Sequence, residues 1–465
     1  MMTPTRLLST LFLAHAHAFS SSSTPSSDSS STPSSDSSSP ASHLLGVTFG
    51  SSVTDATPMQ KHMMPDKGLS SAGAVCLDGS DAGFYFSAAT SSASASSWQI
   101  YFEGGGWCYD ENDCWGRSQG QLGSSKDWPP TVGAGGIMSS DCNVNPTFCS
   151  FNRVYLKYCD GNSFSGDRTE PVRVVGPTAG ATPKPLYFRG RRILDAVLDT
   201  LAAKHGLTNA TDVLLTGCSA GGLATYLHTD YVGKRLATIA PRLARYKAAP
   251  ISGFFLRHAN IYRAQVYPTE MKYIFEMSNA SYGVNAACVA AQPPESKWEC
   301  NFAESAFAFT VAPIFPLNSA LDSWQTACIF ASAIPDGFPA QNNTDNGECN
   351  ALDGWTACAA DPEKCNASGI ETMNGYMQDF ASIMKGKATY FRPGNGAFIH
   401  SCHTHCEAQN DAMFMGFAVA NVTMRQAVAA WWAADRHAPA SEHSYSACAY
   451  KESTPHMCNP TCAAA

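Results

Sequence analysis

The feature that most constrains the fold is an alternation of apolar runs that surrounds a tight, glycine-rich turn. Residues 212–216 read Asp-Val-Leu-Leu-Thr, as a short buried strand does, and residues 193–201 carry apolar side chains at helical spacing. The turn at 217–222, Gly-Cys-Ser-Ala-Gly-Gly, follows that strand and precedes another helical pattern that begins near Leu223. This succession predicts an α/β fold with a central, mostly parallel sheet, right-handed crossovers and helices on both faces.

Ser219 lies in a Gly-x-Ser-x-Gly pattern that is typical of a nucleophile elbow. In such a strand-to-helix turn the neighbours of the serine are small, because larger side chains would collide with the flanking strand and helix. The N–H group of Ala220 would then point to where negative charge develops on a substrate oxygen. The pattern alone recurs by chance, but its position between a strand and a helix predicts Ser219 as a nucleophile.

A second glycine run, Phe-Glu-Gly-Gly-Gly-Trp at 102–107, follows a predicted strand at 97–102. Three glycines allow backbone N–H groups to face a substrate without obstruction by Cβ atoms. Hydrolases with a nucleophile elbow place a His-Gly-Gly-Gly loop at this point, and Glu103 takes the place of the histidine here. The run predicts further oxyanion donors; a turn that only reverses the chain is the alternative.

A serine nucleophile needs a histidine to accept its proton and a carboxylate to orient that histidine. In this kind of enzyme the acid follows the serine along the chain, and the histidine comes last. The candidate histidines are His400, His403 and His405. The candidate acids include Asp322, Asp336, Asp353 and Asp379. The residue types and their order leave the choice among these candidates open.

Residues 402–406, Cys-His-Thr-His-Cys, also contain the ligand types of a zinc site. Cysteines of an exported protein tend to be oxidised, which removes the thiolates, and the spacing is not that of a zinc finger or ribbon. The sequence therefore predicts neither a metal nor another cofactor.

The N-terminal part of the chain predicts export. Arg6 precedes an apolar run at 7–18 that ends in Ala-His-Ala, a pattern accepted by signal peptidase, so we expect a signal peptide at residues 1–18. Residues 19–43 are mostly Ser, Thr, Pro and Asp, which lack the apolar surface needed to offset the entropy of ordering, and predict a flexible stalk. No further break in composition follows, so residues 44–465 are expected to form one catalytic domain.

The cysteine count supports this location. Eighteen cysteines behind an export signal predict a disulfide framework in an oxidising compartment. Candidate glycan sites are the proline-free Asn-x-Ser/Thr sequons at Asn209, Asn279, Asn342, Asn366 and Asn421.

Cys218 is a special case because it precedes the candidate nucleophile. A side chain at that position normally points into the core, and we expect a buried, reduced thiol. Removing one cysteine from 18 leaves 17, an odd number, so another cysteine would be unpaired, or else Cys218 is bonded after all.

Composition excludes some classes of function. With 30 basic and 38 acidic side chains the net charge is -8, so the electrostatic signature of a nucleic-acid-binding protein is missing. The longest apolar stretch after the signal, residues 306–333, contains prolines and polar residues, and we expect no membrane span.

Several longer motifs occur in an order that matches a known family. They are 102–108, 151–154 with 158–161, 186–190, 217–222, 318–325 (Asn-Ser-Ala-Leu-Asp-Ser-Trp-Gln), 401–406 and 458–462 (Cys-Asn-Pro-Thr-Cys). They resemble the pectin acetylesterase family, which includes the Notum carboxylesterases, and the last three are similar to plant members. Together they cover most of residues 70–465.

The resemblance implies an α/β-hydrolase fold with disulfide-bonded loop insertions, and a serine carboxylesterase that needs no cofactor. It also selects among the open candidates: Ser219 matches the nucleophile, Asp322 the acid and His405 the histidine. By the same matching the oxyanion hole would consist of the backbone N–H groups of Gly105, Gly106 and Ala220.

The expected reaction is removal of O-acetyl groups from a pectin-like cell-wall polysaccharide, outside the cell or in the cell wall. Removal of a fatty acyl group from a protein, as in the Notum branch, is one alternative; a secreted binding protein on an inactive hydrolase scaffold is another. Residues 251–257 read Ile-Ser-Gly-Phe-Phe-Leu-Arg where plant members have Asp-Ala-Gly-Phe-Phe-Leu-Asp, so two acidic positions are lost. Because the chain is acidic overall, binding a polygalacturonate would need a local basic patch, for which Arg189, Arg191 and Arg192 are candidates.

Overall fold

The computed structural model describes residues 57–64, 73–176, 182–333, 351–352, 354–444 and 459–462. The chain divides into two units, Met1–Thr48 and Phe49–Ala465, and all described residues belong to the second. The expected signal peptide and stalk lie outside the described residues, as does the expected start of the catalytic domain.

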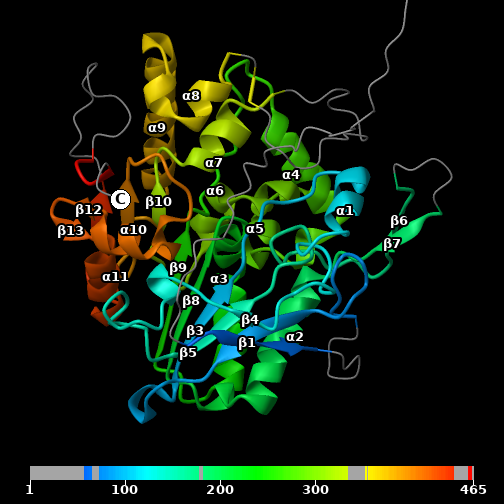
Figure 1. Ribbon diagram of the computed structural model, residues 1–465, viewed down its shortest axis with the longest axis vertical. Helices are drawn as coiled ribbons and strands as arrows, with labels where there is room; N and C mark the ends of the chain where they lie inside the picture. Colours follow the sequence, from blue (N-terminus) through cyan, green and yellow to red (C-terminus); the bar gives the residue numbers. More distant parts are fainter. Residues whose placement is uncertain are drawn as a thin grey trace, which may run out of the picture. The chain divides into compact units, whose positions relative to one another are not determined.

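The second unit is organised around a ten-stranded sheet with the strand order β14-β11-β10-β9-β8-β3-β5-β2-β1-β4 among the described residues (Figure 1). Its strands are β1 (Met59–Met63), β2 (Gly83–Ser87), β3 (Ser97–Phe102), β4 (Thr131–Val132), β5 (Asn152–Leu156), β8 (Asp212–Cys218), β9 (Arg245–Ile251), β10 (Leu317–Ser319), β11 (Gly396–His400) and β14 (Ser441–Ser444). Pairing is parallel from β14 through to β5, and antiparallel where β2, β1 and β4 extend the sheet. The expected mostly parallel sheet is confirmed.

In the described part of the chain, two short two-stranded sheets lie outside the central one. They pair β6 (Val172–Val174) with β7 (Lys184–Leu186), and β12 (Ala418–Val419) with β13 (Val422–Thr423). The α-helices are α1 (Glu111–Arg117), α2 (Gly190–Lys204), α3 (Ala220–Ile239), α4 (Val266–Met277), α5 (Ala286–Ala291), α6 (Ala303–Ala306), α7 (Ser323–Gln325), α8 (Thr356–Ala360), α9 (Ala367–Lys385), α10 (Asp411–Gly416) and α11 (Met424–Ala433).

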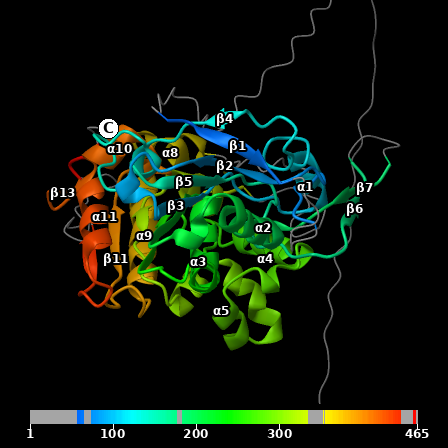
Figure 2. The same ribbon diagram turned by 90° about the horizontal axis from the view of Figure 1, so that it is seen from below.

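Side chains of the central strands alternate between two buried layers. On β3 and β8, Ile100 and Leu215 belong to the apolar cluster that includes buried residues of α2 and α3, whereas Tyr101 and Leu214 belong to the cluster that includes α11. Figure 2 shows α2 and α3 against one face of the sheet and α11 beside β11. Because both faces of the strands are covered, β3 is buried along its whole length, as a central parallel strand should be.

Disulfides join distant parts of this unit. Among the described residues they pair Cys76–Cys159, Cys108–Cys114, Cys142–Cys149, Cys218–Cys406, Cys288–Cys300, Cys358–Cys365 and Cys402–Cys462. Three of these pairs close loops of only six or seven residues, whereas the Cys218–Cys406 bond spans 188.

The expectation of a reduced thiol at Cys218 is wrong. Its side chain does point into the core, where it is 1% exposed. However, the loop after β11 enters the same apolar cluster and brings Cys406 to it, in a left-handed backbone conformation with φ of 64°. A contact between residues so far apart in the chain leaves no local signal.

Two expectations concern the surface of the protein. The sequon residues Asn209, Asn279, Asn366 and Asn421 are exposed, and Asn342 lies outside the described residues. Among the helices described, none combines the length and the hydropathy that crossing a bilayer requires.

Candidate active site

Ser219 occupies the turn between β8 and α3, at the carboxyl edge of the sheet. Its φ of 61° and ψ of -128° are strained for a residue with a side chain. The turn is held on both sides: the Ser219 N–H donates to the carbonyl of Ile251, at 3.1 Å, and its carbonyl accepts from Leu223, at 2.8 Å. This is the strained strand-to-helix turn that a nucleophile elbow requires.

The glycines around Ser219 are needed because backbone segments approach closely. A Cβ atom on Gly221 would lie 2.1 Å from the carbonyl oxygen of Phe102, at the end of β3. A Cβ atom on Gly104 would lie 2.3 Å from the carbonyl oxygen of Cys218 and 2.8 Å from Cβ of Ser219. The glycine loop (residues 104–106) therefore packs directly against the elbow, as the two glycine runs predicted.

The glycine loop has a conformation that only glycine adopts easily. Gly105 and Gly106 have φ of 131° and 66°. The Gly106 carbonyl accepts from the Tyr158 hydroxyl, at 2.8 Å, and from Arg117, at 3.4 Å. Within the part of the chain that the structure describes, the N–H groups of Gly105 and Gly106 donate to no protein acceptor. As the first residue of α3, Ala220 also has an N–H without an acceptor in its helix.

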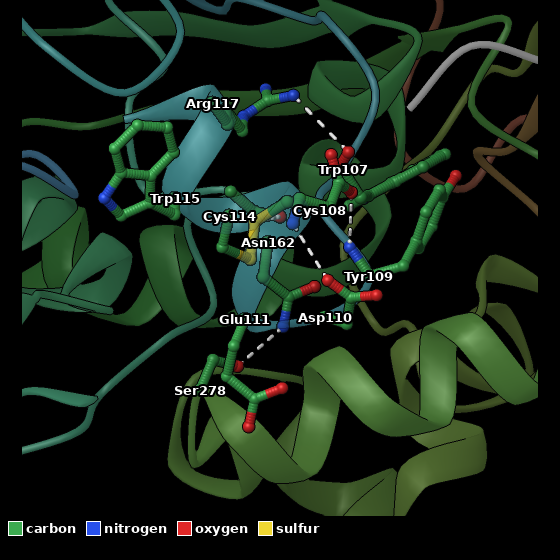
Figure 3. Close-up of a disulfide and its surroundings, with 12 residues drawn as sticks. Trp107, Cys108, Tyr109, Asp110, Glu111, Cys114, Trp115, Arg117, Asn162 and Ser278 are labelled. Atoms are coloured by element: carbon green, nitrogen blue, oxygen red, sulfur yellow. Dashed lines mark hydrogen bonds between the residues drawn. A yellow bond between two sulfur atoms is a disulfide. The ribbon is translucent and has the colours of Figure 1, made fainter. Parts of the chain in front are cut away.

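The chain after the glycine loop is held by the short α1 helix (Figure 3). A disulfide joins Cys108 to Cys114, and Asp110 caps the helix by accepting from the N–H of Asp113 at 2.8 Å. Figure 3 also shows Arg117 reaching back to the carbonyl oxygen of Trp107, at 3.5 Å. These contacts fix the segment that carries the loop.

Glu103 stands where the His-Gly-Gly-Gly loop of other hydrolases has its histidine, and it connects the start of the glycine loop to the residues after β5. Its carboxylate forms an ion pair with Lys157 and accepts from the N–H of Tyr158 at 2.7 Å. Burial raises the pKa of Glu103, and the positive charge of Lys157 opposes that shift.

Asp322 and His405 come together although they lie 83 residues apart. Asp322 is fully buried at the start of α7, where Oδ1 accepts from the N–H groups of Trp324, at 3.0 Å, and Gln325, at 3.1 Å. Its other oxygen, Oδ2, lies 2.8 Å from Nδ1 of His405. With Nδ1 donating to this carboxylate, Nε2 of His405 is left free to accept a proton.

The electrostatics of His405 follow from its neighbours. Burial lowers the pKa of the His405 imidazole. The Asp322 carboxylate raises that pKa through its charge and its hydrogen bond, and the charge of Glu407 raises it further. The net effect is a raised pKa of His405. The side chain is 9% exposed, so one edge of the ring still reaches solvent.

A disulfide ties the two candidate catalytic segments together. It joins Cys218, which precedes Ser219, to Cys406, which follows His405, with 5.7 Å between the Cα atoms. The two sulfur atoms and a ring nitrogen of His405 all lie within 4.8 Å of one another. The elbow and the histidine loop (residues 401–407) are therefore immediate neighbours.

The other candidates for the triad lie elsewhere. His403 Nε2 lies 3.0 Å from the hydroxyl of Thr326, and His400 lies 3.1 Å from Glu407 in the core. Asp379 lies 3.4 Å from Nε2 of His258 on the surface. The remaining two acids, Asp336 and Asp353, lie outside the described residues.

The zinc alternative for residues 402–406 does not fit the donor atoms. Cys402 is bonded to Cys462 and Cys406 to Cys218, so neither offers a thiolate. The oxidation expected of an exported chain accounts for both cysteines.

Sequence reasoning did not identify Ser163, which links the glycine loop to α3. Its hydroxyl accepts from Nε1 of Trp107 at 2.8 Å and donates to the carbonyl of Ala220 at 2.8 Å. Because Ser163 and Ala220 lie 57 residues apart, no spacing in the sequence indicates the contact.

The three arginines of the expected basic patch have partners within the protein. Arg192 pairs with Asp167 at 2.8 Å, and Arg191 lies 3.8 Å from Asp195. Arg189 donates to the carbonyl groups of Gly73 and Thr169. Much of their charge is thus neutralised or used to hold loops.

Aromatic side chains pack together beside His405. The ring centroids of Phe255 and Trp324 lie 6.2 and 6.5 Å from the His405 ring, and Trp107 packs against both aromatic rings. Trp107, Phe255 and Tyr267 are only 2%, 1% and 1% exposed. Trp324, in contrast, is partly exposed.

Comparison with known proteins adds independent information. A family model described as pectinacetylesterase matches residues 55–463. Pectin acetylesterase 11 of Arabidopsis thaliana is 33% identical over 364 residues, which cover 77% of this chain and 84% of that protein. The palmitoleoyl-protein carboxylesterase Notum of Schmidtea mediterranea is 30% identical over 257 residues, 54% of this chain and 46% of that protein.

Among solved structures, the Wnt deacylase Notum from Drosophila has a similar fold. The TM-score is 0.62 at 22% sequence identity, and the match covers 80% of this chain and 92% of that one. The similarity confirms the expected hydrolase-type α/β fold.

Proposed function

The chain belongs to the pectinacetylesterase family and is a carboxylic ester hydrolase, and on this premise we propose that it removes acetyl groups from an O-acetylated, pectin-like polysaccharide. We further propose Ser219, Asp322 and His405 as its catalytic triad. The observation that carries the proposal is the hydrogen bond between Asp322 and His405, next to a strained serine turn to which the histidine loop is cross-linked.

In the first step Oγ of Ser219 attacks the ester carbonyl carbon while Nε2 of His405 takes the hydroxyl proton. The carbonyl electron pair moves onto oxygen, and that negative charge is stabilised by the N–H groups of the glycine loop and of Ala220. Asp322 holds the imidazole in the required tautomer and stabilises its protonated form. The C–O bond then breaks, the sugar hydroxyl leaves with the proton from His405, and an acetyl-serine remains.

In the second step water replaces the sugar hydroxyl. His405 takes a proton from the water as its oxygen attacks the acetyl carbonyl, and the same N–H groups stabilise the second oxyanion. When the acyl bond to Ser219 breaks, His405 returns the proton to the serine and acetate is released.

The packing beside His405 supports a short acyl group. A fatty chain would need an apolar cavity, whereas Trp107, Phe255 and Tyr267 have almost no accessible surface and only Trp324 in this cluster is partly exposed. At the three buried rings this packing favours an acetyl ester over the deacylase alternative, in which the substrate is a fatty-acylated protein. An acetyl group requires only the space of one methyl group beyond the carbonyl.

The N-terminal signal pattern, the disulfides and the exposed sequons support action outside the cell. This location agrees with a cell-wall polysaccharide as the substrate.

The proposal is tested with the purified enzyme and its Ser219→Ala variant on p-nitrophenyl acetate and p-nitrophenyl octanoate. We expect the wild type to prefer acetate, and the substitution to lower kcat by at least about 1,000-fold at an unchanged melting temperature. A fluorophosphonate probe should label the wild type at Ser219 and leave the variant unlabelled.

Each contrary result contradicts a different part. Unchanged turnover by the Ser219→Ala variant would exclude this serine as the nucleophile. A higher rate on octanoate would favour the fatty deacylase, and a wild type that neither turns over esters nor reacts with the probe would favour the inactive binding protein. Acetate release from acetylated pectin, compared with release from acetylated xylan, tests the polysaccharide itself.

A further inference from the structure

A buried pair of ionisable groups, His400 and Glu407, lies at the two ends of the histidine loop that carries the proposed catalytic histidine. Nε2 of His400, on β11, lies 3.1 Å from Oε1 of Glu407, and both side chains are 0% exposed. The rings of Phe398 and Phe417 lie close to His400, with centroids 6.2 and 5.1 Å from that of the imidazole. A carboxyl group in such apolar surroundings is costly unless its partners compensate for the lost water.

The second oxygen of Glu407 is connected to the histidine loop through Ser252. The Ser252 hydroxyl donates to Oε2 of Glu407 at 3.0 Å and accepts from the N–H of Cys406 at 3.0 Å. Ser252 and Cys406 both have a left-handed backbone, with φ of 43° and 64°. Such conformations cost free energy for residues with a Cβ atom, so contacts of this kind are needed to maintain them.

The same group of side chains also holds the start of the loop. Nδ1 of His400 accepts from the N–H of Cys402 at 3.2 Å. Because Nδ1 is an acceptor, the proton of a neutral His400 ring lies on Nε2, the nitrogen that faces Glu407. Both ends of the histidine loop are therefore held by one buried group, defined here as Ser252, His400 and Glu407.

We propose that Glu407 is a positioning residue of this enzyme, which holds the histidine loop in place through Ser252 and His400 and stabilises the protonated form of His405 with its negative charge. The inference rests on the proposed function because it assumes that His405 is the general base. It adds a second carboxylate to the site. Asp322 precedes His405 in the sequence, and Glu407 follows it.

The charge effect agrees with the surroundings of His405. Its charged neighbours among the described residues are Asp322, at the start of α7, and Glu407, on its own loop, and both raise the pKa of the imidazole. The remaining groups packed against the ring are the aromatic side chains of Phe255 and Trp324 and the Cys218–Cys406 disulfide, none of which carries a charge. Nε2 of His400 faces Glu407 from β11 at 3.1 Å.

The main test is the Glu407→Gln variant, which keeps the shape and one of the two carboxylate oxygens and removes the charge. In the pH profile of kcat/KM for p-nitrophenyl acetate, the acidic limb reports the pKa of His405 in the free enzyme. We expect this limb to move to lower pH, because a negative charge that favours the imidazolium is lost. A merely structural role would change the rate and leave the midpoint in place.

A second variant tests the mechanical connection. Ser252→Ala leaves the Cys406 N–H and a Glu407 oxygen without their partner, and we expect kcat to fall by roughly 10-fold with KM changed by less than about 2-fold. The matched control is Glu299→Gln, which removes a carboxylate that pairs with Arg257 at 2.6 Å and does not contribute to the pKa of His405. Circular dichroism and thermal melts verify that the variants are folded.

The inference is overturned if the acidic limbs of Glu407→Gln and the wild type coincide, or if the limb moves to higher pH. If Ser252→Ala keeps the kcat of the wild type, the proposed connection through the Ser252 hydroxyl is overturned. If Glu407→Gln does not fold, Ser252→Ala alone tests the inference. These failures differ from a failure of the proposed function, because in that case the wild type itself would show no Ser219-dependent turnover.

Discussion

At the residue scale, the site is supported by carboxyl groups whose titration is altered by burial, and Asp113 is the clearest example. It lies in α1, next to Cys114 of the Cys108–Cys114 disulfide, and is 7% exposed. Burial raises the pKa of Asp113 to about 7, although the Tyr109 N–H, which donates to it at 2.8 Å, and Arg117 act in the opposite direction. In the unfolded chain the pKa would be about 4, so between these values the folded state holds a proton that the unfolded state has lost. Stability therefore falls as the pH rises through this window.

The Asp113→Asn variant should lack this pH dependence, because the amide keeps an acceptor for Tyr109 and does not titrate. We compare the free energy of unfolding of the variant with that of the wild type at each pH. We expect this difference to change in favour of the variant by roughly 1 to 3 kcal/mol from about pH 4 to pH 8. Urea denaturation at both pH values measures the difference. The exposed Asp127→Asn serves as the control; equal pH dependence in both variants would contradict the prediction.

At the scale of elements, the site is assembled from ends of strands that are distant in the sequence. The elbow follows β8, the glycine loop follows β3, and the histidine loop follows β11. Hydrogen bonds within the sheet place β3 next to β8, but two further strands separate β8 from β11. The Cys218–Cys406 disulfide bridges that distance directly.

Removal of this bond by Cys218→Ala with Cys406→Ala should therefore affect both stability and catalysis. In the chain-entropy account a loop of this length is worth about 5 kcal/mol and a seven-residue loop about 2. We expect a large fall in melting temperature together with at least a roughly 10-fold loss of kcat on p-nitrophenyl acetate. The control is the double Cys142→Ala, Cys149→Ala variant, which opens a loop of 7 residues. Wild-type kcat without the Cys218–Cys406 bond would show that the cross-link does not position the site.

At the scale of the whole molecule, charge sets how a polyanionic substrate approaches. The net charge is -8, and the arginines of the expected basic patch are engaged with carboxylates and carbonyl groups. A pectin-like chain with free carboxylates should thus be repelled at long range. Salt screens this repulsion, with a Debye length of about 30 Å at 0.01 M and about 8 Å at 0.15 M.

We accordingly expect the KM for acetylated polygalacturonate to fall by roughly 2- to 3-fold between these ionic strengths. The KM for neutral p-nitrophenyl acetate should stay the same and serves as the control. A KM for the polysaccharide that rises with salt would instead indicate a local cationic binding site.

The sequence by itself determined the parts that depend on neighbours in the chain. The apolar patterns predicted the strand at 97–102 and the helix around 193–201, which the structure has as β3 and as the longer α2 (Gly190–Lys204). The glycines at 217, 221 and 222 indicated a tight turn, because backbone segments approach so closely at these three positions that a Cβ atom would collide with them. Such signals are local, and they identified the serine turn and the glycine loop.

Only the tertiary structure decided the rest, because the remaining contacts join residues that the chain separates widely. Residue types left three histidines and several acids open until family resemblance selected among them, and the Asp322–His405 hydrogen bond depends on how β10 and β11 pair. For the oxidised state of Cys218 the even number of cysteines was the one signal in the sequence, and the buried group of Ser252, His400 and Glu407 had none. These contacts form where strand ends meet at one edge of the sheet, and the strand order that brings them together is a property of the whole fold.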